Sequence, residues 1–222
     1  MIQNCPGYDQ IPGVVHHAHN ELKQCLWTLY WLVRTLPARN IVELGIRHGE
    51  TTRALLSGAR DLVELGIRAP DGPGKLLTYR PHFVGTLGAK VTSFDIDGDA
   101  YRLKDDIAPS QGYAMVDALW DCRKSDSVQA GLEWREGPVD LLFVDTAHTY
   151  QHTKMEIAVW SKWIRVGGIM AFHDTDLTDP GLDGVKPAIV DFLASHGDQW
   201  TFENHPQTGH GDTGIGWLVR DQ

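Results

Sequence analysis

An acidic and an imidazole side chain follow an apolar segment near residue 140. Residues 139–144 (VDLLFV) form an apolar run that is broken only by Asp140. Such a run is typical of a parallel strand that is buried on both faces. The run stops at Asp145, and His148 follows three residues later. An imidazole with an unperturbed pKa of about 6.5 suits a general base at neutral pH.

A second pair of polar residues follows the next apolar run. Residues 169–172 (IMAF) end in the pair His173-Asp174. Ligands of an open parallel α/β sheet sit beyond the carboxyl ends of its strands. We therefore expect the polar residues after both strands to meet at one edge as an active site: Asp145, His148, His173 and Asp174. The alternative for the aspartates is N-capping of helices, and for His148 it is support of a loop.

The segment between the two runs predicts a helix. Ile157, Trp160 and Ile164 fall on one apolar stripe. The pair Gly167-Gly168 is expected to end this helix, because glycine is common just after a helix.

A glycine-rich turn follows a third apolar segment. Residues 41–52 read IVELGIRHGETT, with Gly45 at the end of the predicted strand, Gly49 four residues later and Thr51 at the start of a helix. Gly45 allows the chain to turn sharply off the strand. Gly49 removes a side chain at the point where a ligand must approach the backbone.

An acidic residue ends the next predicted strand. Residues 91–97 read VTSFDID, and the strand ends in Asp95. A carboxylate in this position can accept two hydrogen bonds from a ribose diol. The glycine turn and this carboxylate together predict a cofactor that contains a nucleoside.

These segments resemble the class I S-adenosylmethionine-dependent methyltransferases. Their first motif is a strand, an acidic residue and then G-x-x-x-G, which VELGIRHG fits, whereas the dinucleotide pattern G-x-G-x-x-G does not fit. The resemblance covers roughly residues 40–220 and is greatest for the metal-dependent O-methyltransferases, which include catechol-type enzymes and relatives in macrolide-sugar and cephalosporin biosynthesis.

The resemblance implies a set of cofactor-binding residues. Glu43, Gly45 and Gly49 are expected around the methionine part of S-adenosylmethionine, and Thr51 opens the helix beside them. Two further carboxylates are expected at the ribose and near the adenine amine, respectively: Asp95 and Asp126.

The resemblance also implies a divalent cation. Its expected ligands are Asp145, His173 and Asp174, and oxygen ligands favour magnesium. The family usually has two oxygen donors after its fifth strand. His173 departs from this pattern, which leaves open whether it binds the cation and whether the preference shifts toward manganese or iron. His148 stands where catechol-type enzymes have a lysine base, so it is the predicted catalytic base beside Asp145.

The predicted architecture is one α/β domain that spans residues 1–222. The resemblance implies a Rossmann-like, doubly wound, mostly parallel seven-stranded sheet in the order 3-2-1-4-5-7-6. Residues 200–205 and 214–220 should form its C-terminal antiparallel hairpin. Residues 1–38 are expected to be an N-terminal helical segment with a helix over 18–36, and residues 67–88, rich in glycine and proline, an insertion.

Two short features stand apart from this architecture. The string VELGIR occurs at residues 42–47 and again at 63–68, and only the first copy has the G-x-x-x-G spacing. We take the first copy as the cofactor turn. The histidines of the N-terminal segment are interpreted as a surface loop or a lid over the pocket: His16, His17 and His19.

Composition excludes several classes of protein. The 222 residues are 42% hydrophobic and carry a formal net charge of -9, which argues against a nucleic-acid surface. No apolar run approaches the roughly 20 residues that span a bilayer. The N-terminus shows no secretory signal, and the three cysteines form no CxxC pair, so a cytoplasmic protein with reduced thiols is expected.

The function predicted from these observations is metal-assisted methyl transfer to a hydroxyl group. The acceptor is a small molecule: a sugar, a phenol or another natural product. Two alternatives stay open, a non-catalytic module that binds S-adenosylmethionine and an NAD-dependent oxidoreductase on a similar fold. The sequence is compatible with a homo-oligomer.

Overall fold

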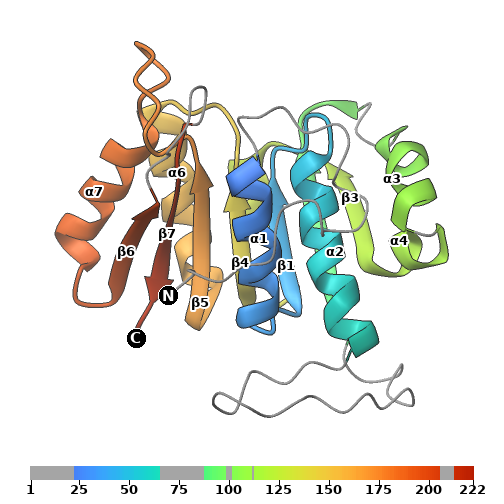
Figure 1. Cartoon of the computed structure of the whole chain (residues 1–222). Helices are drawn as coiled ribbons and strands as arrows, with labels where there is room; N and C mark the ends of the chain where they lie inside the picture. The colour runs from blue at the N-terminus through green and yellow to red at the C-terminus, as the bar shows by residue number, and fades with distance from the viewer. Residues whose placement is uncertain (1–22, 66–87, 99–101, 112, 206–212) are drawn as a thin grey trace.

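Seven strands form one sheet in the order β3-β2-β1-β4-β5-β7-β6 (Figure 1). The computed structural model describes residues 23–65, 88–98, 102–111, 113–205 and 213–222. The strands are β1 (Asn40–Leu44), β2 (Lys90–Asp95), β3 (Trp120–Lys124), β4 (Val139–Val144), β5 (Ile164–His173), β6 (Trp200–His205) and β7 (Ile215–Arg220). The pairs from β3 to β5 are parallel, while β7 runs antiparallel to both β5 and β6. The predicted strand order and C-terminal hairpin are confirmed.

Helices cover both faces of the sheet. They are α1 (Lys23–Thr35), α2 (Glu50–Leu65), α3 (Leu103–Gln111), α4 (Tyr113–Leu119), α5 (Ser127–Glu133), α6 (Tyr150–Trp160) and α7 (Val185–His196). Buried residues of α1 to α4 belong to one hydrophobic cluster, and those of α5 to α7 belong to a second. Figure 1 shows α1 and α2 across the near face. The chain is therefore a three-layer α/β structure.

The two clusters follow from alternation along the central strands. Ile41 and Leu141 face the α1–α4 side, while their neighbours Val42 and Leu142 face the α5–α7 side. Successive side chains of a strand point to opposite faces, so a continuous apolar run fills both layers. This arrangement explains why the run at residues 139–144 could be interpreted as a doubly buried strand.

The predicted end of the helix after β4 is wrong. α6 ends at Trp160, a short 3₁₀ turn covers Ser161–Trp163, and β5 begins at Ile164. The glycine pair lies inside β5, where the pairing of β4 with β5 shifts register between Val139 and Leu141. Gly167 has a φ of 72°, a conformation that glycine tolerates, so the pair serves an irregular strand instead of a helix end.

Other segments can be compared with expectation only in part. α1 lies within the predicted helix over 18–36. The second VELGIR begins inside α2, which extends to Leu65, whereas the first begins in β1 and continues into the glycine turn. The choice of the first copy as the cofactor turn stays a prediction. The N-terminal histidines and residues 67–87 of the predicted insertion lie outside the described residues.

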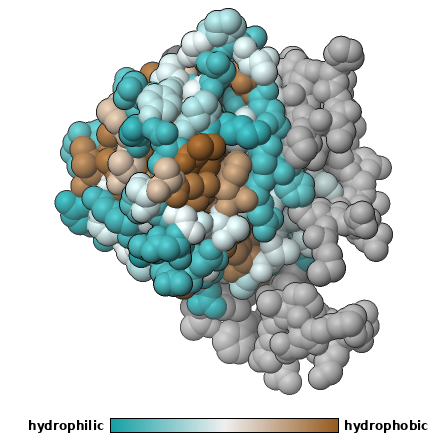
Figure 2. All heavy atoms as spheres, turned by 90° about the vertical axis from the view of Figure 1, so that its left-hand side faces the viewer, coloured by the Kyte–Doolittle hydropathy of each residue, from teal (hydrophilic) through white to brown (hydrophobic). Residues whose placement is uncertain are grey.

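The surface beside α7 and β6 is mostly hydrophilic, with hydrophobic side chains gathered near its centre (Figure 2). Among the described residues, few large hydrophobic side chains are exposed, and Val190 of α7 is one of them. A folded protein ordinarily leaves some apolar side chains exposed. No described helix has the length and apolar character required to cross a membrane. The compatibility with a homo-oligomer stays a prediction.

The backbones that follow β1 and β4 are in contact at the upper edge of the sheet in Figure 1. The Asp145 amide donates to the carbonyl of Leu44 over 2.9 Å, and the Gly45 amide donates to the carbonyl of Phe94 over 2.9 Å. Gly45 has a φ of 87°, and a Cβ at this position would lie 2.0 Å from the Asp145 carbonyl oxygen. Only glycine fits here, and its absence of a side chain brings the two loops into contact.

The contact at Gly45 can be tested by stability. Gly45→Ala should lower the free energy of unfolding by more than about 2 kcal/mol, because strain at positive φ adds to a steric overlap with backbone. Gly137→Ala is the matched control, since Gly137 has a φ of 91° but open space around it. That control should lose only about 1–2 kcal/mol. Equal losses in urea unfolding would show that the contact imposes no constraint.

Candidate active site

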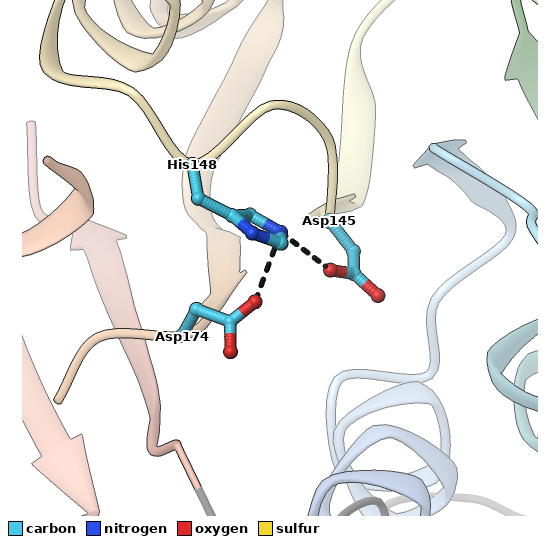
Figure 3. Close-up of side chains that lie close together, drawn as sticks. All are labelled: Asp145, His148 and Asp174. Carbon is cyan, nitrogen blue, oxygen red and sulfur yellow. Dashed lines mark hydrogen bonds and ion pairs between the residues drawn. The ribbon is translucent and has the colours of Figure 1, made fainter. Parts of the chain in front are cut away.

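Three side chains point toward one another beyond the ends of β4 and β5 (Figure 3). The Nε2 atom of His148 lies 3.0 Å from Oδ1 of Asp145 and 2.9 Å from Oδ2 of Asp174. Asp174 is buried, and Asp145 and His148 are half-buried. One imidazole nitrogen therefore bridges two carboxylates that belong to adjacent parallel strands.

His173 lies near the same two carboxylates. Its Nδ1 atom is 3.0 Å from Oδ2 of Asp174 and 3.6 Å from Oδ1 of Asp145. The side chain is buried, and its Nε2 atom has no hydrogen-bond partner among the described residues. The structure thus brings together the four residues expected to meet, with His173 contacting mainly Asp174.

The backbone holds His148 and Asp174 in an unusual conformation. Their φ angles are 54° and 59°, in the left-handed region that side-chain-bearing residues rarely adopt. The carbonyl of His148 accepts a hydrogen bond from the Gly184 amide over 3.1 Å, and the carbonyl of Asp174 accepts one from the Leu177 amide over 3.3 Å. Strain of this kind persists where surrounding contacts enforce it, and it often accompanies function.

The charges of the cluster shift its pKa values. Burial lowers the pKa of His148, but its hydrogen bonds to Asp145 and Asp174, with the charges of both, raise it to about 10. Burial opposes ionisation of Asp174, yet hydrogen bonds from His148 and His173 hold its pKa well below the usual range. Burial likewise lowers the pKa of His173, but the hydrogen bond with Asp174 and the charges of Asp145 and Asp174 together raise it. His148 is therefore an imidazolium at neutral pH in this arrangement.

The cluster opens into a cavity of about 460 Å³. The cavity is large enough for a small organic ligand. Its walls come from the glycine turn after β1, the start of α2, the ends of β4 and β5 with the loops after them, and the segment before β7. The lining residues are Ile46, Arg47, His48, Glu50, Thr51, Asp145, His148, His173, Asp174, Leu177 and Thr213. The cofactor turn and the acid cluster therefore share one cavity.

Several lining residues were not identified from the sequence. Ile46, Arg47 and His48 lie between the two glycines of the turn, so the G-x-x-x-G spacing itself is the signal that could have found them. Leu177 and Thr213 come from two distant segments. No local pattern marks them, because only the pairing of β5 with β7 brings their segments together.

Asp95 holds the glycine turn. Its Oδ2 atom accepts hydrogen bonds from the amides of Ile46 and Arg47 over 2.8 and 3.2 Å, and Oδ1 accepts one from the Asp97 amide over 2.8 Å. The contact fixes Arg47 in its left-handed conformation, with a φ of 48°. These contacts use both lone pairs of Oδ2 and one of Oδ1, which leaves one lone pair of Oδ1 for a hydroxyl. The predicted contact with a ribose stays a prediction.

Glu43 lies beneath the same turn and is fully buried. Its carboxylate accepts hydrogen bonds from the hydroxyls of Thr51, Thr52 and Ser93 over 2.7, 2.8 and 2.5 Å. Burial raises its pKa to about 7, against the effect of these three hydrogen bonds. Glu43 does not line the cavity, whereas Thr51 does. Their predicted contacts with a cofactor are untested.

The remaining predicted cofactor residues have structural contacts. Gly49 has a φ of 74°, and a Cβ there would lie 3.1 Å from Cδ1 of Ile107 on α3. Oδ1 of Asp126 caps α5 by accepting from the amides of Val128 and Gln129, both over 3.0 Å. Asp126 is exposed and lies outside the cavity lining, so its role at an adenine stays a prediction.

The donor set can accommodate a divalent cation. Ligand atoms of Asp145, His148 and Asp174 all lie within 4.8 Å of one another. Carboxylates are donors for magnesium and manganese, and an imidazole is a donor for iron. Two negative groups at this separation repel each other unless a positive charge lies between them, so the residues fit such an ion.

Comparisons with known proteins place the chain in a family. Residues 42–175, more than half of the chain, match a family described as a methyltransferase domain. The chain belongs to this methyltransferase family. The recognition of a class I methyltransferase and of an enzyme is thereby confirmed. No curated protein matches the chain significantly.

Solved methyltransferase structures share the fold of the chain. One is an O-methyltransferase from Bacillus cereus in complex with S-adenosylhomocysteine, at 18% identity and a TM-score of 0.62, over 92% of this chain and 83% of that one. Another, from Streptomyces achromogenes, is an O-methyltransferase involved in tomaymycin synthesis and solved with S-adenosylmethionine, at 16% identity and a TM-score of 0.63, over 90% and 81% of the chains. A methyltransferase from Podospora anserina, bound to S-adenosylhomocysteine, has 14% identity and a TM-score of 0.62, over 90% and 79%.

Because Glu43 is buried, we expect the free energy of unfolding of this methyltransferase to depend on pH. Its pKa is raised from 4.5 to about 7 on folding, so folding favours the protonated form. The associated stability is complete below pH 4.5 and is lost as the pH rises to about 7. The loss should reach about 3 kcal/mol in wild type.

Urea unfolding across this pH range tests the prediction. Glu43→Gln, which imitates the protonated carboxyl group, should remove this part of the pH dependence. Glu203→Gln alters an exposed glutamate of β6 and should leave the dependence unchanged. A Glu43→Gln profile that parallels the wild type would show that Glu43 is ionised throughout.

Proposed function

We propose that the chain is an S-adenosylmethionine-dependent O-methyltransferase that uses a divalent cation and methylates a hydroxyl group of a small molecule. Membership of the methyltransferase family supports methyl transfer. Similar folds have been solved with S-adenosylmethionine and S-adenosylhomocysteine bound, which supports the choice of cofactor. Sugars and phenols are the acceptor classes that the cavity size and the polar lining allow.

The observation that carries the proposal is the convergence of Asp145 and Asp174 on one point inside the cavity. Both carboxylates lie within 3.0 Å of the same nitrogen of His148, so they share one positive charge. In the proposal Asp145 and Asp174 hold the cation, and His173 orients Asp174 through their hydrogen bond. When bound, magnesium or manganese would supply the charge that stabilises an ionised acceptor hydroxyl.

His148 has the position of a general base in this proposal. Its Nε2 atom takes the proton from the acceptor hydroxyl, the acceptor oxygen forms a bond to the methyl carbon, and the carbon–sulfur bond breaks. The products are a methyl ether and S-adenosylhomocysteine, with the proton on His148. The hydrogen bonds to Asp145 and Asp174 stabilise that imidazolium. A base must start neutral, and cation charge beside the two carboxylates would lower the pKa of His148 from about 10.

The glycine turn has the position of the cofactor site. Gly45 and Gly49 flank three residues that line the cavity, Ile46, Arg47 and His48, and Thr51 reaches the cavity from the start of α2. Asp95 fixes the amides of the turn, which orients this wall before any ligand binds. Positioning of two reactants accounts for effective molarities of about 10⁵ M or more.

Cofactor choice is tested by calorimetric titration with S-adenosylmethionine, S-adenosylhomocysteine and NAD. We expect the first two to bind and NAD to bind far more weakly, because G-x-x-x-G does not provide the dinucleotide turn. Tighter binding of NAD would contradict the proposed function. A panel of sugars, catechols and phenols, assayed by release of S-adenosylhomocysteine, then identifies the acceptor.

The cation site is tested by two substitutions that each replace a carboxylate with an uncharged amide of the same size. Asp145→Asn and Asp174→Asn should each weaken binding of manganese at least about 10-fold, because each removes a charged ligand. Binding of S-adenosylhomocysteine should stay within about threefold, since the cofactor contacts lie on the glycine turn. Asp179→Asn changes an exposed carboxylate after β5 and serves as the control. Unaltered manganese binding in both variants would contradict a cation site here.

The base role of His148 is tested by His148→Ala at saturating manganese. Turnover should fall by roughly 10²–10⁴-fold, the usual range for a positioned base. Part of the rate should return at high pH, where the acceptor hydroxyl ionises without a base. Manganese binding measured on the same variant separates the two roles of the imidazole. A large loss of manganese affinity would identify His148 as a ligand instead of a base.

A further inference from the structure

A buried carboxylate outside the cavity connects two loops at the edge of the sheet. Glu156 of α6 is fully buried among apolar neighbours such as Ile157 and Trp160. Its Oε1 atom accepts hydrogen bonds from the hydroxyl of Ser127 over 2.5 Å and from the hydroxyl of Thr146 over 2.8 Å. None of these hydroxyl residues lines the cavity.

The two hydroxyl groups belong to the two halves of the proposed site. Thr146 directly follows Asp145, on the side of the cation and the acceptor. Ser127 directly follows Asp126, on the side where an adenine is expected. The Ser127 carbonyl also accepts a hydrogen bond from Nε1 of Trp160 over 2.9 Å, which ties the start of α5 to α6. A single carboxylate oxygen therefore links both halves.

Within the described part of the chain, only one of the two carboxylate oxygens of Glu156 is hydrogen-bonded. Its Oε2 atom has no partner among the described residues, although it is fully buried. Burial of a charged or polar oxygen without a partner is unfavourable, and an apolar side chain of similar size would often serve stability better. A buried polar atom of this kind calls for another explanation, and function is one.

The neighbouring histidine does not make this cluster a hydrolytic site. His152 Nε2 lies 2.9 Å from Oγ of Ser127 and 3.2 Å from Oε1 of Glu156. A serine–histidine–acid relay requires the serine and the acid to contact different ring nitrogens. Here one nitrogen contacts both, so the imidazole cannot pass a proton from Ser127 toward the acid. The cluster is a set of hydrogen bonds around one carboxylate.

We infer that Glu156 is a positioning residue that couples binding of the nucleoside cofactor to binding of the divalent cation. The inference rests on the proposed function. Because Ser127 and Thr146 share one acceptor oxygen, an ordered Ser127 favours one position of the Thr146 loop and therefore of Asp145. Each ligand should then raise the affinity for the other by the same factor, as linkage requires.

The coupling can be measured directly. Manganese affinity is determined by calorimetry without S-adenosylhomocysteine and with the compound at saturation. We expect wild type to bind manganese at least about fivefold more tightly in its presence, the lower range of such couplings. Glu156→Met, which preserves volume and removes the acceptor, should bring this ratio to about one. Glu156→Gln retains an acceptor oxygen and should restore part of the ratio.

Two further variants separate coupling from a general loss of structure. Ser127→Ala and Thr146→Val each remove one hydroxyl and should each abolish the coupling, even if Glu156→Met does not fold. Thr92→Val removes a buried hydroxyl that has no described hydrogen-bond partner, and it should leave the ratio unchanged. A structural role alone would lower stability without altering the ratio.

The outcomes distinguish this inference from the proposed function. Binding of both ligands by wild type without coupling would overturn the inference alone. A ratio that persists in Ser127→Ala and Thr146→Val would also overturn it, because a direct interaction between the ligands would then carry the coupling. A wild-type protein that binds neither ligand would overturn both.

Discussion

The contact between Gly45 and the carbonyl of Asp145 is the constraint on which the site depends. A Cβ on Gly45 would lie 2.0 Å from that oxygen, so the turn after β1 and the loop after β4 can meet only through glycine. The hydrogen bond from the Asp145 amide to Leu44 fixes the same contact. The proposed cofactor wall and the proposed cation wall therefore share one cavity because two backbones touch.

The charges of Asp145, His148 and Asp174 determine the chemistry beyond the ends of β4 and β5. Asp145 and Asp174 come from adjacent strands and would repel each other, yet His148 lies between them as an imidazolium. In the proposal, a cation held by the two carboxylates would take over this balancing positive charge and leave His148 neutral as the base. Left-handed backbone at His148 and Asp174 keeps the side chains directed at this point.

Three other acids position backbone or hydroxyl groups. Asp95 accepts from the amides of the glycine turn, Glu43 accepts from hydroxyls at the start of α2, and Glu156 joins the loops beyond β3 and β4. Burial makes such groups unfavourable unless they are hydrogen-bonded, so each is held by two or more donors. Asp95, Glu43 and Glu156 therefore hold the segments around the cavity in place. Asp145 and Asp174 line the cavity, and the proposal assigns the ligand chemistry to them.

The sequence by itself determined the family through its glycine motif, and the resemblance to that family supplied the strand order. It also determined the meeting of Asp145, His148, His173 and Asp174, since buried strands show as apolar runs and parallel strands present their carboxyl ends at one edge. It misassigned Gly167-Gly168, because a glycine pair suits a helix end and an irregular strand equally well. Tertiary structure alone decided that one nitrogen of His148 bridges two carboxylates, that Leu177 and Thr213 line the cavity, and that Glu156 links two loops. These contacts join residues from separate segments, and their distances follow from side-chain direction and strand register, which no local pattern encodes.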